Sequence, residues 1–135
     1  CNYMQKEGIE SIDVVSAKEM LSAVEDNILD CDIFISVAAV SDFIAKNLNN
    51  DKIKSNQDIN LDLIKNVDIL QTISENYDVF TIGFAAETSE LKNNALKKLK
   101  NKKISVVAAN KVSFTEGIDN NNNSITLFGS ITTSA

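Results

Sequence analysis

The chain has 135 residues, of which 44% are hydrophobic and 24% are charged, and its net charge is -6 at pH 7. This length predicts one domain spanning residues 1–135, and the acidic balance argues against a nucleic-acid partner, because such binding needs a basic surface. The absence of His excludes histidine metal sites and histidine-based triads, and the isolated Cys1 and Cys31 form no metal or disulfide motif.

No apolar run is long enough to cross a bilayer, and no secretory signal opens the chain. We therefore expect a cytoplasmic protein with no membrane partner. The first residue is Cys1 rather than Met, which suggests a processed chain or a piece of a longer protein.

The first predicted elements are a short strand over residues 12–15 and an amphipathic helix after it. Ser16 and Glu19 have the spacing of a capping box at the helix start. Apolar residues then recur at helical spacing as far as Ile28. A second strand begins at Ile33, so this region predicts the beginning of a βαβ unit.

The stretch from Ile33 to Lys54 is the part of the sequence that best predicts where a ligand binds. It opens as a continuous apolar run, which predicts a strand buried on both faces, as in a parallel sheet. Small residues follow at Ala38–Ala39, then an acid at Asp42 and a loop carrying Lys52. Ligands of open α/β sheets bind outside the carboxyl ends of such strands, so this stretch predicts a binding edge.

Strands and helices alternate through the rest of the chain, which predicts an α/β fold with a mostly parallel sheet in three layers. The expected elements are a strand at 61–64, a helix capped by Asn66 and running through Ile73, a strand at 79–84, a helix at 89–103, a strand at 104–109, an asparagine-rich turn at 119–123 and a strand at 125–128 with a hairpin turn at Gly129–Ser130.

Three core strands are each predicted to end in an alanine pair, at Ala38–Ala39, Ala85–Ala86 and Ala108–Ala109. Small residues at equivalent strand ends indicate a crevice that no large side chain fills. Alanines also suit tight crossings between sheet and helix. Spacing alone leaves both interpretations open.

Two lysines depart from the expected helix pattern. At about 100° per residue, Lys98 and Lys102 each fall roughly 20° from Leu91, on the apolar stripe. Their stems can cover apolar surface while the ammonium groups reach water, and cations suit the last turn of a helix. Alternatively, both ammonium groups face a bound phosphate chain.

Five motifs together resemble the phosphopantothenate–cysteine ligase (phosphopantothenoylcysteine synthetase) domain of bacterial bifunctional coenzyme A biosynthesis proteins. The resemblance covers residues 14–128 and rests on Ala38-Ala39-Val40-Ser41-Asp42, Lys52-Ile53-Lys54, Lys65-Asn66-Val67-Asp68-Ile69-Leu70, Gly83-Phe84-Ala85-Ala86-Glu87-Thr88 and Ala109-Asn110-Lys111-Val112. Gly-Phe-Ala-Ala-Glu-Thr, in register with the others, is the most specific of them.

This resemblance implies a Rossmann-like fold and a homodimer. It also implies a ligase that activates 4′-phosphopantothenate with CTP and Mg²⁺ and then joins the acyl-cytidylate to cysteine, releasing CMP. The implied partners are CTP, 4′-phosphopantothenate, cysteine and a fused or separate FMN-dependent decarboxylase, with no FMN in this chain. We expect no metal ligands from the protein, so that Mg²⁺ travels on the triphosphate.

Carried onto this sequence, the family's motifs imply one nucleotide site. Lys52, on the family's lysine flap, is the catalytic candidate, and Asn110 is a candidate at the substrate edge. The implied nucleotide contacts are Ser36, Val37, Ala38, Asp42, Lys52, Val67, Asp68, Ile69, Leu70, Phe84, Lys98 and Lys102.

The chain departs from the family pattern in three places. Ser55 replaces a third flap lysine, and Val67 stands where the family usually has Pro. The family's N-terminal portion, which holds a glycine-rich turn and an intermediate-binding Asn, has no counterpart here, nor does its C-terminal helix. We therefore expect the C-terminal, nucleotide-binding portion of the ligase domain, incomplete at its N-terminus.

Two other functional classes share this predicted fold. A nicotinamide-dependent oxidoreductase is disfavoured because no Gly-x-Gly-x-x-Gly follows a strand and no Tyr-x-x-x-Lys is present. In a non-catalytic Rossmann-like domain, the alanines would be packing and Lys52 would lie in a solvated loop. The sequence does not decide between CTP and ATP.

Overall fold

The computed structural model describes residues 8–47, 60–87, 90–111 and 124–129. Its elements are α1 (Ala17–Asn27), the 3-10 helix η1 (Ile28–Asp30), β1 (Ile33–Ser36), β2 (Phe43–Ala45), β3 (Leu63–Lys65), α2 (Ile69–Asn76), β4 (Phe80–Glu87), α3 (Leu91–Lys102), β5 (Val106–Lys111) and β6 (Ile125–Gly129). Within these ranges, no helix is both long and apolar enough to span a membrane.

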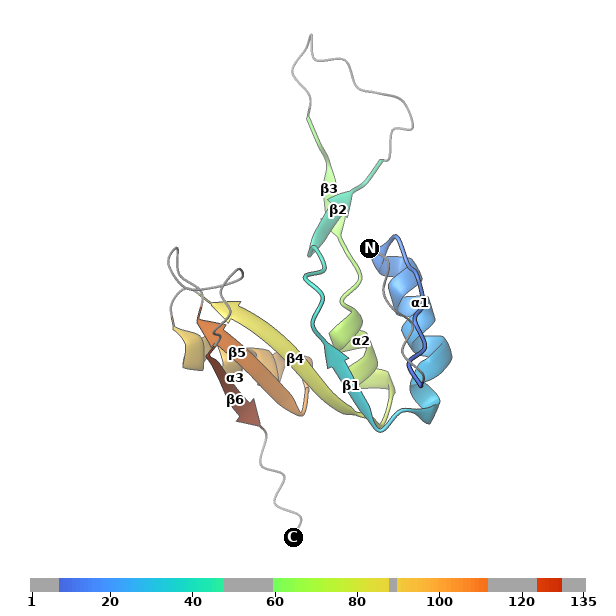
Figure 1. The fold of residues 1–135 in the computed structure, drawn as a ribbon. Coiled ribbons are helices and arrows are strands. Elements are labelled where there is room, and N and C mark those ends of the chain that lie inside the picture. Colours follow the sequence, from blue (N-terminus) through green and yellow to red (C-terminus); the bar gives the residue numbers. More distant parts are fainter. Residues whose placement is uncertain (1–7, 48–59, 88–89, 112–123, 130–135) are drawn as a thin grey trace.

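The main sheet has the strand order β1-β4-β5-β6. β1, β4 and β5 are parallel, and β6 closes one edge as an antiparallel strand against β5. β2 and β3 form a separate antiparallel ribbon that stands away from the main sheet (Figure 1). The prediction of a mostly parallel α/β fold is confirmed.

Helices α2 and α3 cover one face of this sheet, with α1 packed beside α2 (Figure 1). Phe34 of β1 contacts both hydrophobic clusters beneath the helices, so the clusters meet on that face. Among the described residues, helices lie on this face only, which accounts for two of the three expected layers. The buried apolar side chains are Ile28, Ile69, Leu70, Ile73, Ala85, Ala95, Leu99, Ile104, Val107, Ala108 and Ala109.

The opposite face of the sheet, which we call the open face, is apolar and exposed. Strand register places Ile33 beside Phe80 and Ile35 beside Ile82 on this face. Ile33 and Ile35 are 55% and 54% exposed, so the prediction that their strand is buried on both faces is wrong for the described chain. The cause is that no described helix covers them. The exposed apolar side chains of the open face are Ile33, Ile35, Phe80, Ile125 and Leu127.

Residues 12–15 do not form the predicted strand. They have no strand partner, and Val15 is 96% exposed while its amide donates to the Glu19 carboxylate (2.9 Å). The Ser16 hydroxyl accepts from the Glu19 amide (3.2 Å), so the expected capping residues do begin α1. β-Branched residues favour a strand locally, but no strand in the part of the chain that the structure describes pairs with residues 12–15.

Helix α2 begins later than predicted. Asp68, not Asn66, is its N-cap, and the Asp68 carboxylate accepts from the Gln71 amide (3.1 Å). Asn66 instead bonds to the Ser41 carbonyl through its side chain (2.8 Å), which holds it outside the helix. The preceding strand is also shifted, from the predicted 61–64 to Leu63–Lys65, because its register is set by β2.

The alanine pairs do not all end strands as predicted. Ala38–Ala39 does follow β1, but β4 continues past Ala85–Ala86 and β5 continues past Ala108–Ala109. Ala108 and Ala109 are buried in mid-strand, so this pair serves packing. The predicted asparagine-rich turn at 119–123 lies outside the described residues, as does Ser130 of the expected hairpin turn.

Candidate functional site

A pocket of about 330 Å³ lies at the carboxyl ends of β1 and β4, beside the start of α2. This is the edge at which open α/β sheets usually bind ligands. Residues from four segments far apart in the chain meet here. They are Ser36, Val37, Ala38, Ala39, Val40, Ser41, Asp42, Val67, Asp68, Ile69, Leu70, Phe84, Ala86, Lys98 and Lys102.

One wall of the pocket is the segment 36–42, which leaves β1. Asn66 fixes the end of this segment, because its amide donates to the Asp42 carbonyl (2.8 Å) and its side chain donates to the Ser41 carbonyl (2.8 Å). The Ser41 hydroxyl in turn donates to the Phe43 carbonyl (2.8 Å). The wall is thus held by main-chain and side-chain bonds and is lined by small residues, which lets a ligand approach the backbone.

The second wall is the N-terminus of α2. Ile69 and Leu70 are buried side chains that anchor this helix, and both residues line the pocket. The first amides of a helix have no intrahelical acceptor, and the helix dipole makes them a favourable environment for anions or polar base edges. One of these amides, that of Gln71, already donates to the Asp68 carboxylate.

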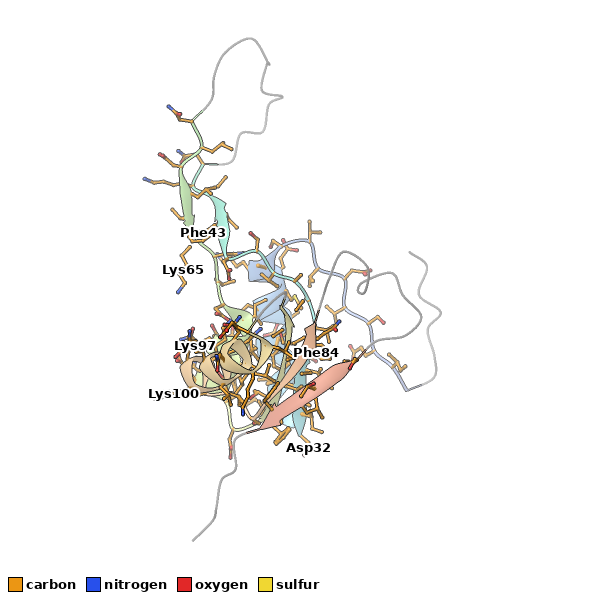
Figure 2. The ribbon with its side chains drawn as sticks, turned by 90° about the vertical axis from the view of Figure 1, so that its left-hand side faces the viewer. Asp32, Phe43, Lys65, Phe84, Lys97 and Lys100 are labelled. Atoms are coloured by element: carbon orange, nitrogen blue, oxygen red, sulfur yellow. The ribbon has the colours of Figure 1, made fainter. Side chains whose placement is uncertain are left out.

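Lys98 and Lys102 form the third wall, from the sheet-facing side of α3. Both side chains are partly buried and line the pocket, whereas Lys97 and Lys100 are exposed. Figure 2 shows Lys97 and Lys100 on the outer side of α3, away from the sheet. Lys98 and Lys102 therefore lie on the side of α3 that borders the pocket, and a role for their ammonium groups in binding phosphate stays a prediction.

Each of these two ammonium groups is held by an acceptor of the pocket wall. Lys98 donates to the main-chain carbonyl of Phe84, and Lys102 makes an ion pair with Asp68 (Nζ–Oδ2, 2.7 Å). Side chains of long, flexible lysines lose entropy when they are ordered, so contacts that order them before a ligand arrives reduce the cost of binding.

Asp68 has a lowered pKa. Burial raises the pKa of this carboxyl, but the hydrogen bond and charge of Lys102, together with the Gln71 amide, outweigh burial and stabilise the carboxylate. The carboxylate is therefore ionised at neutral pH and serves two neighbours at once. It caps α2 with one oxygen and holds Lys102 with the other.

The structure brings most of the predicted nucleotide contacts together in this one pocket. Lys52 lies outside the described residues. Asn110 does not line the pocket. Its strand partner Ala86 does line it. The predicted contacts that line the pocket are Ser36, Val37, Ala38, Asp42, Val67, Asp68, Ile69, Leu70, Phe84, Lys98 and Lys102.

Four lining residues were absent from the predicted site, namely Ala39, Val40, Ser41 and Ala86. Ala39 and Ala86 belong to alanine pairs that the sequence singled out, so small size at a strand exit was a usable signal. Val40 and Ser41 belong to the motif Ala38-Ala39-Val40-Ser41-Asp42, so their place between two predicted contacts was the signal that could have found them.

The pocket offers cations, helix amides and small side chains rather than acid–base groups. In the described ranges, no cluster of three or more His, Cys, Asp or Glu could hold a metal ion. Such a site suits an anionic ligand bound by charged hydrogen bonds, each of which typically contributes about 1.5–3 kcal/mol.

Sequence comparison places the chain among proteins of pantothenate metabolism. The model of the DNA/pantothenate metabolism flavoprotein C-terminal domain matches residues 1–134. The coenzyme A biosynthesis bifunctional protein CoaBC of Vibrio parahaemolyticus is 39% identical over 127 residues, which is 90% of this chain and 32% of that protein. The protein of the same name from Escherichia coli K12 is 32% identical over 127 residues, covering 89% and 31% respectively.

Solved structures agree with the fold. The C-terminal domain of a coenzyme A biosynthesis bifunctional protein CoaBC matches with a TM-score of 0.67 and 33% identity, over 87% of this chain and 50% of that one. A DNA/pantothenate metabolism flavoprotein from Streptococcus pneumoniae matches with a TM-score of 0.62 and 21% identity, over 84% and 64%, which supports the fold alone. The chain spans about a third of the length of the curated relatives it matches. With a family model matched along almost its entire length, the chain belongs to the DNA/pantothenate metabolism flavoprotein C-terminal domain family.

Proposed function

We propose that this chain is the nucleotide-binding part of a phosphopantothenate–cysteine ligase that uses CTP in coenzyme A biosynthesis. The observation that carries the proposal is the pocket itself. Two inward-facing lysines, a helix N-terminus and the small residues after β1 converge on one cavity at the carboxyl edge of a parallel sheet. The names of the relatives, all coenzyme A biosynthesis bifunctional proteins, support the choice of pathway.

We assign the triphosphate to Lys98 and Lys102, because these two lysines line the pocket. The main chain of Ser36–Ala38 and the start of α2 take the nucleoside, because they line the pocket and the first amides of a helix suit polar base edges. Asp42 carries a negative charge, so it suits a hydroxyl or amino group rather than phosphate. Mg²⁺ is carried by the triphosphate, in keeping with its preference for substrate phosphates and water.

In the proposed reaction, a carboxylate oxygen of 4′-phosphopantothenate attacks the α-phosphorus of CTP, and pyrophosphate leaves. The amine of cysteine then attacks the acyl carbon, an amide bond forms, CMP leaves and the amine gives up a proton. Positioned cations stabilise the negative charge that develops on the phosphoryl oxygens, and positioning supplies much of the rate. A protein without His is compatible with this chemistry.

The test of this proposal is calorimetric titration of the chain with CTP and Mg²⁺, with NADPH in a parallel titration. We expect CTP to bind and NADPH not to bind. In the variant Lys98→Ala/Lys102→Ala, we expect affinity for CTP to fall at least about tenfold, because two charged hydrogen bonds to phosphate are removed.

The matched control is Lys97→Ala/Lys100→Ala, which removes the same charge from the outer side of the same helix. We expect this variant to bind CTP within about twofold of the parent, since exposed charges act weakly at this range in salt. Equal loss in both double variants would contradict the site and leave only a general effect of net charge.

Three further assignments are part of the proposal. Lys52 acts as a catalytic cation from the lysine loop, and Asn110 lies at the substrate edge. The chain acts as a homodimer alongside an FMN-dependent decarboxylase. The bifunctional names of the relatives support a second activity beside the ligase. Its cytoplasmic location stays a prediction.

Sedimentation of the purified chain tests the homodimer. We expect about twice the mass of one chain, 14.8 kDa, at micromolar concentration. A species of one chain across the whole concentration range would contradict it.

A further inference from the structure

Ser74 of α2 reaches across to the main chain of α3. Its hydroxyl donates to the carbonyl of Lys102, which is 28 residues away in the sequence. The same hydroxyl lies 3.0 Å from the Gln71 carbonyl, the acceptor that a helical serine normally uses within its own helix. Ser74 thus links the helix that lines one pocket wall to the helix that carries the two inward-facing lysines.

The carbonyl that Ser74 binds belongs to the last residue of α3. The last four carbonyls of a helix lack intrahelical donors, so an external donor stabilises the final turn. α3 also ends in a left-handed residue that is not Gly, Lys103, with φ of 50°. A left-handed C-cap is unfavourable for a residue with a Cβ, so the hydrogen bond from Ser74 adds stability where α3 ends.

Lys102 is consequently held at two points by one helix. Asp68 at the start of α2 pairs with its ammonium group, and Ser74 binds its carbonyl. α2 itself is fixed by buried side chains, including Ile73, which is fully buried. Both contacts therefore hold Lys102 against a helix that is anchored in the hydrophobic core.

We propose that Ser74 is a positioning residue for nucleotide binding, acting through Lys102; this inference rests on the proposed function of the pocket. Without the Ser74 bond, the last turn of α3 loosens and the Lys102 ammonium group leaves Asp68. Lys98 lies one turn earlier on the same face, and like charges four residues apart repel each other. The Ser74 bond keeps Lys102 on the pocket wall before the triphosphate arrives, while the Phe84 carbonyl holds Lys98.

The test combines CTP affinity with a readout that needs no ligand, the pKa of Asp68 followed by carboxyl carbon NMR. In Ser74→Ala, we expect CTP to bind about three- to tenfold more weakly and the pKa of Asp68 to rise toward its ordinary value. Ser74→Thr restores a hydroxyl and should restore both quantities. Asn76→Ala removes a bond within α2, to the Thr72 carbonyl, and should change neither.

Ser74→Cys is the second variant if the alanine variant does not fold, because it is close in size and its thiol is a weaker donor. We expect it to shift both readouts in the same direction as alanine. Unchanged CTP affinity in folded Ser74→Ala or Ser74→Cys overturns the inference, even if the melting temperature falls. An unchanged Asp68 pKa overturns the route through Lys102.

The two proposals fail in different ways. If the parent chain does not bind CTP, the proposed function fails, and the pKa of Asp68 alone decides the role of Ser74. If the parent binds CTP and the serine variants bind equally well, the function stands and the positioning role is overturned.

Discussion

At the scale of single residues, Asp68 connects stability to the pocket. Its carboxylate caps α2 and pairs with Lys102, and both contacts favour the ionised form. A lowered folded-state pKa means that the unfolded chain binds the proton more readily. The stability that Asp68 contributes is therefore present at neutral pH. It is lost as the pH falls from the ordinary pKa of an aspartate toward the lower pKa of Asp68 in the folded chain.

Asp68→Asn separates the two contacts, because Asn is also a good N-cap but carries no charge. We expect the variant to lose about 1 kcal/mol of unfolding free energy at neutral pH, the upper end of the range for surface ion pairs, because this pair is partly buried. This difference from the parent should shrink as pH is lowered to about 3. Urea unfolding at several pH values measures it, and a difference that grows in acid would contradict the account.

At the scale of elements, the contact between β4 and α2 sets where the pocket's second wall lies. Gly83 faces α2, and a Cβ built there would stand 2.5 Å from Leu70 Cδ2 and 3.1 Å from Ile104 Cδ1. Glycine at this point allows the helix to approach the sheet closely. Leu70 is itself a lining residue, so the spacing between these elements shapes the pocket.

Gly83→Ala should therefore destabilise the chain by about 1–3 kcal/mol through overpacking, and should weaken CTP binding because α2 is displaced. Gly129→Ala is the control, since its nearest neighbours would be 3.8 Å from the new Cβ, an ordinary contact distance. Thermal unfolding compares the two variants. A similar melting temperature for both would mean that the Leu70 side chain moves aside freely.

The sequence predicted elements well where periodicity and packing agree. The stripe of Leu91 and Ala95 located α3 within two residues at its start, and it correctly separated inward-facing Lys98 and Lys102 from outward-facing Lys97 and Lys100. Sequence-based prediction failed where a hydrogen bond between distant residues determines where a helix begins. A cap at Asn66 was locally reasonable, but a distant carbonyl, that of Ser41, takes up the Asn66 side chain.

At the scale of the whole molecule, the described helices cover only one face of the main sheet (Figure 1). The sequence indicated a buried strand at Ile33 because apolar runs are normally covered on both faces, but composition does not say what supplies the cover. The open face exposes Ile33, Ile35, Phe80, Ile125 and Leu127. Contiguous apolar surfaces of this kind favour association.

We therefore expect the isolated chain to bind an apolar dye and to associate as its concentration rises. Ile35→Lys/Leu127→Lys should reduce both effects, because charge is placed on the open face. Val15→Lys, at a 96% exposed position in the loop before α1, is the control and should change neither. Light scattering with dye fluorescence measures this, and equal association in all three proteins would contradict it.

The central claim, that a nucleotide lies across the ends of β1 and β4 against the start of α2, is tested most directly by amide NMR during titration with CTP and Mg²⁺. We expect the largest chemical-shift changes on residues 36–42, on Asp68–Leu70 and on Phe84. Changes concentrated on Lys97 and Lys100, or on β6, with the pocket amides unmoved, would contradict it.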